Sequence, residues 1–151
     1  MLGVSKRKNQ ARRNMRKFPI QPSNKNRSKY GNHRTTILLG DEFIKFDSFA
    51  ESKRALHLHV LLQYKTISEL TLQPKFELQA GFKRNGKAIR AINYIADFSY
   101  VMDGVRHIED VKGMKTDTYQ MKKKLFLNKH GDGLVFSEVY LKGNRWEVVT
   151  I

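Results

Sequence analysis

The sequence predicts an α/β fold in which a mixed central sheet is flanked by helices. Three observations predict it: two segments have the apolar spacing of amphipathic helices, several other apolar runs have strand character, and an Asp-Gly pair joins two of those runs as a hairpin. Because the chain has 151 residues and 40 % of them are hydrophobic, one packed domain is expected.

The first predicted elements are an extended lead-in and a helix. Residues 35–46 alternate loosely between apolar and polar side chains around a turn at Gly40. Residues 48–65 carry apolar side chains at helical spacing, which predicts the first helix. Its apolar residues form two stripes, with Phe49, Leu56 and Val60 on one and Ala55, Leu58 and Leu62 on the other.

Three strand-forming runs follow that helix. Residues 70–79 predict a strand at a sheet edge or with a bulge, because Pro74 within it donates no ladder hydrogen bond. After a basic turn at residues 81–86, residues 88–102 predict one long strand. The Asp-Gly turn then places the third run, residues 105–112, antiparallel beside the second.

A second helix and two final strands complete the predicted domain. A threonine or aspartate within residues 116–118 can cap a helix that runs to about Lys129, with Met121 and Leu125 on its buried stripe. The remaining predicted strands are residues 134–141 and 146–151.

A flexible basic arm, residues 1–30, is predicted to precede the folded domain of residues 31–151. The arm has ten lysines and arginines, no acid and few large apolar residues, so it cannot bury enough surface to order itself. The whole chain has a formal charge of +15, which favours a polyanionic partner such as nucleic acid. The residues expected to contact phosphates are Arg12, Arg13, Arg16, Lys17 and Lys29 of the arm and Lys123 of the second helix.

The composition excludes several kinds of site. The chain has no cysteine, so disulfides, cysteine zinc sites and a thiol nucleophile are excluded, and any metal must be held by oxygen or imidazole. No apolar run reaches the roughly 18 residues of a membrane span. We therefore expect a soluble, cytoplasmic protein without membrane contact.

Two acids and a lysine are predicted to meet across the hairpin. Asp97 lies among apolar and aromatic residues, where an unpaired carboxylate is costly to bury. On the next strand, alternation places Asp110 and Lys112 on one face, opposite to that of Glu109. Because the strands are antiparallel neighbours, Asp97 can approach Asp110, and a metal ion would explain how the two carboxylates tolerate each other.

These residues suit metal-dependent hydrolysis of a phosphodiester bond. The reaction needs a divalent cation to offset phosphate charge, a water that the cation makes nucleophilic, and a group that positions this water. Mg²⁺ prefers oxygen ligands and keeps several waters, so two or three acids and a lysine are sufficient. Glu51 on the first helix is the candidate third acid; with Ser48 it also matches a capping box, and the two roles are compatible.

Other interpretations of the same residues stay open. Asp97 and Asp110 would be structural if they pair with Lys112 or with an arginine such as Arg90 or Arg106. The protein would then be a non-catalytic nucleic-acid-binding protein, or a factor that contacts an acidic protein partner. The basic arm alone would look the same in a localisation signal or an RNA-binding segment.

Five runs of the sequence occur in an order that is more specific than any one of them: 28–32 (SKYGN), 46–51 (FDSFAE), 72–78 (LQPKFEL), 94–98 (YIADF) and 109–113 (EDVKG). Together they resemble a phage-borne family of small PD-(D/E)XK endonucleases, formerly catalogued as a domain of unknown function and similar to Holliday junction resolvases. The resemblance covers almost everything after the arm. The proline of the motif's name is missing, since Ala96 precedes Asp97.

The resemblance implies a restriction-endonuclease-like (PD-(D/E)XK) core and a metal-dependent DNA endonuclease. It implies that Glu51, Asp97 and Asp110 are ligands of Mg²⁺, for which Mn²⁺ can substitute. The Val111 carbonyl can add a ligand, and Lys112 positions the attacking water. The implied substrate is branched DNA such as a Holliday junction, in phage recombination or replication in the cytoplasm of the bacterial host. Because a resolvase cuts two strands symmetrically, a homodimer is expected.

Overall fold

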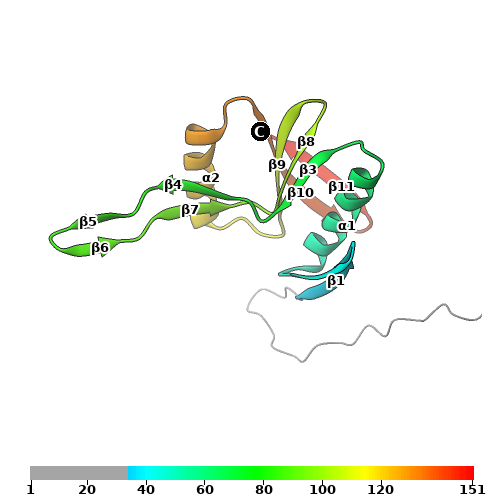
Figure 1. Cartoon of the computed structure of the whole chain (residues 1–151), viewed down its shortest axis with the longest axis horizontal. Coiled ribbons are helices and arrows are strands. Elements are labelled where there is room, and N and C mark those ends of the chain that lie inside the picture. Colours follow the sequence, from blue (N-terminus) through cyan, green and yellow to red (C-terminus); the bar gives the residue numbers. More distant parts are fainter. Residues whose placement is uncertain (1–33) are drawn as a thin grey trace, which may run out of the picture.

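The computed structural model describes residues 34–151 (Figure 1). These residues form a five-stranded sheet with a helix on each face, and a long two-stranded extension leaves that sheet. The predicted basic arm, residues 1–30, and the first three residues of the predicted domain lie outside the described residues. In chain order the elements are β1 (Thr35–Leu39), β2 (Glu42–Phe46), α1 (Phe49–Gln63), β3 (Ser68–Leu72), β4 (Lys75–Gln79), β5 (Phe82–Arg84), β6 (Lys87–Ile89), β7 (Ile92–Ile95), β8 (Phe98–Met102), β9 (Val105–Val111), α2 (Asp117–His130), β10 (Leu134–Lys142) and β11 (Arg145–Thr150).

The central sheet has the strand order β11-β10-β9-β8-β3 and is mixed. Strands β9 and β10 are parallel and are connected through α2, whereas the other neighbouring pairs are antiparallel. The predicted hairpin between β8 and β9 is confirmed, with Met102 paired to Val105 around the Asp103-Gly104 turn. The predicted α/β class, with a mixed sheet and flanking helices, is therefore confirmed.

The two faces of the sheet bury two separate cores because side chains alternate along each strand. On one face, Ala55 and Leu58 of α1 pack with Val111 of β9. On the other face, Phe126 of α2 packs with Ile108 of β9. Strand β9 thus contributes to both cores and lies at the centre of the fold.

A predicted apolar stripe faces the sheet in α1, but the stripe predicted for α2 does not. Ala55 and Leu58 are fully buried, whereas the stripe of Phe49 is exposed. In α2 the predicted buried stripe was wrong: Met121 and Leu125 are 55 % and 44 % exposed. The face that meets the sheet there includes polar side chains that bind a buried acid, so apolar periodicity alone misidentified it.

Two predicted strands are each divided in the structure. The run of residues 70–79 splits at Gln73 and Pro74 into β3, which ends the central sheet, and β4, which leaves it. The run of residues 88–102 splits into β6, β7 and β8, and the predicted basic turn at residues 81–86 contains β5 instead. The edge position predicted from the proline is confirmed for β3.

The segments that leave the sheet form an extension of two antiparallel strand pairs, β4 with β7 and β5 with β6 (Figure 1). The base of this extension packs against α2, where the centres of the Phe76 and Phe126 rings lie 4.8 Å apart.

Within the described part of the chain, no helix is long and apolar enough to span a membrane.

Candidate functional site

Asp97 lies between β7 and β8, at the point where the extension joins the central sheet. Its backbone N–H donates to the Glu109 carbonyl at 3.1 Å, and the pairing of Phe98 with Glu109 places Asp97 opposite Asp110. The Val111 N–H donates to Asp97 Oδ2 at 2.7 Å. The register of the hairpin thus brings the two predicted acids to one end of adjacent strands, as the sequence predicted.

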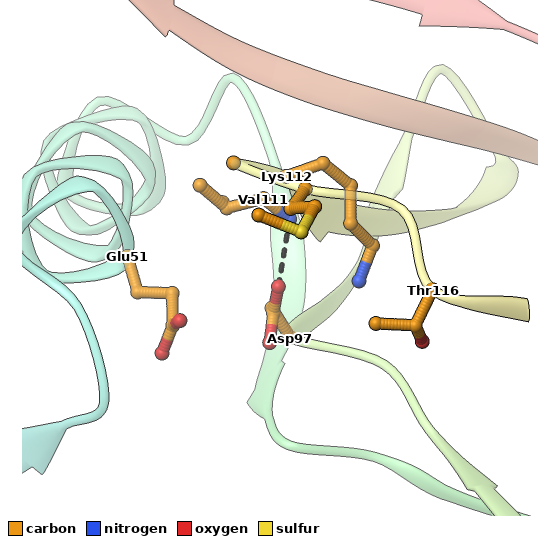
Figure 2. Close-up of a pocket in the computed structure, with 7 residues that line it drawn as sticks. Glu51, Asp97, Val111, Lys112 and Thr116 are labelled. Atoms are coloured by element: carbon orange, nitrogen blue, oxygen red, sulfur yellow. Dashed lines mark hydrogen bonds between the residues drawn. The ribbon is translucent and has the colours of Figure 1, made fainter. Parts of the chain in front are cut away.

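An open pocket of about 510 Å³ lies at this end of the sheet. Figure 2 shows Glu51 entering from α1 on one side and Lys112 on the other, with Asp97 between them. The lining residues are Glu51, Asp97, Val111, Lys112, Gly113, Met114 and Thr116. The pocket therefore gathers three of the four predicted catalytic residues.

The fourth, Asp110, does not line the pocket and is buried, with an exposure of 1 %. Its Oδ2 accepts a hydrogen bond from the Tyr94 hydroxyl. Its Oδ1 lies 3.3 Å from Lys112 Nζ but accepts no hydrogen bond from a described residue. The same ammonium lies 4.0 Å from the centre of the Tyr119 ring, a cation–π contact that holds it beside the carboxylate.

Glu51 forms the predicted capping box at the start of α1. Ser48 Oγ accepts from the Glu51 N–H at 3.1 Å and donates to Glu51 Oε1 at 2.9 Å, while the Asp47 N–H donates to Oε2 at 3.2 Å. Burial raises the pKa of the Glu51 carboxyl, although these hydrogen bonds act in the opposite direction. Glu51 therefore caps the helix and also lines the pocket.

The carboxylates of the site repel one another. Burial and the neighbouring charge of Asp110 raise the pKa of Asp97 to about 7, Glu51 adds to the rise, and Lys112 only partly opposes it. A divalent cation would relieve this repulsion, and it would add a partner for Oδ1 of Asp110, which accepts no hydrogen bond from a described residue.

The two aspartates supply oxygen donors of the kind that could hold Mg²⁺. No group of three or more acids or histidines is close enough to hold a metal within residues 34–151. Mg²⁺ commonly takes only one or two carboxylates and keeps several waters, so Asp97 and Asp110 satisfy its requirement. The carboxylate of Glu51 accepts one cap hydrogen bond at each oxygen, and each oxygen keeps a further lone pair with which it could join the set.

In the metal-free protein, Asp97→Asn is expected to stabilise the fold, and more at pH 8 than at pH 5. An aspartate in the unfolded chain titrates near pH 4, whereas folded Asp97 has a pKa of about 7. The stabilisation from its proton is therefore present below pH 4 and lost as the pH rises through 7. Asparagine has no proton to lose, so the gain at pH 8 is on the order of 1–3 kcal/mol. Thermal unfolding in chelator measures this gain, and an equal effect at both pH values would contradict the prediction.

A buried acid that the sequence analysis missed, Glu138, lies beside Asp110 on the neighbouring parallel strand. Burial would raise its pKa, but donated hydrogen bonds lower the pKa to about 2. The donors are Lys115, Lys123, Tyr119 and Tyr140. The signal that identified Asp97, an acid inside an apolar strand, was also present at Glu138.

Lys123, a predicted DNA contact, is one of those donors. Its Nζ lies 2.8 Å from Glu138 Oε1, and its side chain is only 11 % exposed. The structure thus places Lys123 in an ion pair under α2, and its contact with DNA stays a prediction. The predicted contacts of the arm, Arg12, Arg13, Arg16, Lys17 and Lys29, lie outside the described residues.

The opposite face of β9 carries a second buried polar network that the sequence analysis also missed. Arg54 of α1 donates to both oxygens of Glu109, at 2.8 Å and 2.6 Å, and the Tyr100 hydroxyl donates to the same carboxylate at 2.7 Å. The arginines considered as partners of the two aspartates lie elsewhere: Arg106 pairs with Glu69, and Arg90 is exposed on the extension. Of the described residues, only Lys112 forms an ion pair with Asp110.

Comparison with known proteins identifies a family for this chain. Residues 27–146 match the family model described as "Protein of unknown function (DUF1064)". No curated protein matches. A solved structure titled "Crystal structure of SSO0001" is similar over 64 % of this chain and 46 % of that chain, at 16 % identity and a TM-score of 0.39. The expectation of a family catalogued as a domain of unknown function is confirmed, and the chain belongs to the DUF1064 family.

Proposed function

We propose that this protein is a metal-dependent DNA endonuclease with a restriction-endonuclease-like (PD-(D/E)XK) core. The observation that carries the proposal is the placement of Asp97 opposite Asp110 at one end of the sheet, with Lys112 Nζ 3.3 Å from Asp110. Such a set of two carboxylates and an ammonium beside an open pocket suits hydrolysis of a phosphodiester bond.

Each residue of the set has a role in this proposal. Asp97 and Asp110 would hold Mg²⁺, or Mn²⁺ in its place, and Glu51 would add a carboxylate from α1. When bound, the ion would offset phosphate charge and make a water more acidic. Lys112 would orient the attacking water, because its ammonium is held at the pocket wall between Asp110 and the Tyr119 ring.

The proposed substrate is branched DNA such as a Holliday junction, in phage recombination or replication in the cytoplasm of a bacterial host. A four-way junction presents two strands related by two-fold symmetry. A homodimer with the same symmetry would bring one pocket to each of them.

The test is cleavage of labelled four-way junction, flap, duplex and single-stranded DNA in Mg²⁺, Mn²⁺ or chelator. We expect cutting in either metal and none in chelator, with the junction cut fastest. Cutting that prefers another branched substrate would correct the substrate and keep the chemistry. Absence of cutting on every substrate in both metals would overturn the proposal.

A second candidate function, non-catalytic binding of nucleic acid, is favoured by two observations. Asp110 is already paired with Lys112 and Tyr94, and residues 34–151 contain no group of three acids or histidines that could hold a metal ion. In this case the chain would bind the same DNA panel in a salt-sensitive way without cutting it.

Removal of residues 1–30 is expected to weaken DNA binding and to flatten its salt dependence. The segment has ten basic residues and no acid, so the truncated protein would release fewer counterions from DNA. Each lost phosphate contact should reduce the slope of log K against log salt by about 0.9. Titrations at several salt concentrations measure this slope, and an unchanged slope would argue against a DNA-binding arm.

A further inference from the structure

The outer part of the extension, residues 79–91, is exposed at every position and contains the paired strands β5 and β6. We call this segment the ribbon tip. Figure 1 shows it projecting away from the central sheet and from both helices. A two-stranded hairpin is at best marginally stable alone in water, so a surface that receives the ribbon tip would stabilise it.

The charge of the ribbon tip has one sign. It has four basic residues and no acid, and none of the four forms an ion pair with a described residue: Lys83, Arg84, Lys87 and Arg90. Arg84 and Lys87 are directly paired across the strands. Like charges in this position destabilise a strand pair, and a polyanion between or beside them removes that cost.

The shape of the ribbon tip suits the major groove of DNA. Asn85 and Gly86 both have positive φ, 49° and 74°, which gives the narrow two-residue turn of a tight hairpin. Just behind the charges, the cross-strand pair Phe82 and Ile89 is 47 % and 41 % exposed, so apolar groups are available to meet thymine methyl groups. The major groove of B-form DNA, about 12 Å wide, admits a two-stranded ribbon, whereas that of A-form RNA is too narrow.

The root of the extension adjoins the candidate site. The Ala96 N–H donates to the Pro74 carbonyl at 3.1 Å, and the Gln73 N–H donates to the Asp97 carbonyl at 2.9 Å. DNA held by the ribbon tip would therefore be held by the element that leads directly into Asp97.

From its charge and its shape, we infer that the ribbon tip inserts into the major groove of duplex DNA and is a second DNA-binding element outside the pocket. The inference deepens the proposed function and rests on it for the choice of DNA as the polyanion. In the proposed complex, the ribbon tip would bind a duplex arm of the substrate next to the site of cleavage.

The test replaces all four basic residues of the ribbon tip by glutamine and measures binding to a labelled duplex and four-way junction in chelator. A matched control replaces Lys45, Lys65, Lys142 and Arg145 by glutamine, which removes the same charge from exposed positions elsewhere. We expect the ribbon variant to bind at least about 30-fold more weakly, with a salt slope reduced by about 3, whereas the control changes affinity less than about threefold. Phe82→Ala should weaken binding without changing the slope.

Thermal unfolding should show that neither four-residue variant has a lower Tm than the wild type, since every replaced side chain is exposed. Equal weakening of the two variants, or no loss in the ribbon variant, would overturn the inference. An equal loss of affinity for A-form duplex RNA would overturn the major-groove assignment. Cleavage is measured separately, so a ribbon-dependent complex that cuts nothing would refute only the proposed nuclease activity.

Discussion

Asp97→Asn is expected to lower metal-dependent cleavage of DNA by at least about a thousandfold, the loss that corresponds to several kcal/mol of transition-state stabilisation by a bound ion. The substitution removes the carboxyl group that is proposed to hold the ion together with Asp110. It keeps the shape of the side chain and the acceptor for the Val111 N–H. Initial rates on the preferred substrate, with DNA binding measured in chelator, separate the loss of chemistry from any loss of affinity.

Asp103→Asn is the matched control for this experiment. Asp103 lies in the exposed turn at the other end of the same hairpin, and asparagine tolerates its positive φ of 51°. The control should cut at the wild-type rate. Wild-type cleavage by the Asp97 variant would show that this carboxylate holds no essential metal, whereas loss of binding together with cleavage would point to misfolding.

Arg54→Ala is expected to destabilise the protein by about 3–5 kcal/mol, because it leaves the buried carboxylate of Glu109 without its charged partner. The side chains of this pair are only 8 % and 2 % exposed. In a domain of this size the loss should lower the Tm by on the order of 10 °C or more. Chemical denaturation at neutral pH measures the free energy of unfolding.

A surface ion pair provides the comparison for this prediction. Arg34 lies 3.3 Å from Asp47 with both side chains about 70 % exposed, so Arg34→Ala should cost less than about 1 kcal/mol. Replacement of the whole buried network by apolar residues, with Arg54→Met, Glu109→Leu and Tyr100→Phe, should recover most of the lost stability. A cost below 1 kcal/mol for Arg54→Ala would contradict the prediction.

Local signals in the sequence predicted the parts of the fold that depend on local interactions. Ser48 and Thr116 accept hydrogen bonds from the backbone at the starts of the two helices, and the Asp-Gly pair turns the β8–β9 hairpin. The approach of Asp97 to Asp110 followed from that hairpin and from strand alternation. These features required no knowledge of distant contacts.

Features that depend on pairing between distant segments were not predictable in the same way. The apolar run of residues 88–102 is continuous in sequence, yet β7 follows β4 out of the sheet and β8 stays in it, because their partners differ. Likewise, Lys123 is a surface residue by helical spacing, but Glu138, 15 residues further on, binds it under the helix. Two side chains that meet only through tertiary packing show no apolar periodicity in the sequence from which their contact could be predicted.

The lysines around β9 and β10 are distributed so that carboxyl groups outnumber ammonium groups at the pocket, although the chain as a whole is basic. Lys115 and Lys123 are occupied by Glu138, so Lys112 is left to face the carboxylates of Asp97, Asp110 and Glu51. Three carboxyl groups thus face one ammonium, in a chain of formal charge +15. In the proposed complex the basic chain would attract DNA, whereas ionised carboxylates at the pocket would repel a phosphate, and a divalent cation would reverse that repulsion. Affinity for DNA should therefore rise when Mg²⁺ is added, even though free Mg²⁺ weakens ordinary phosphate contacts through screening.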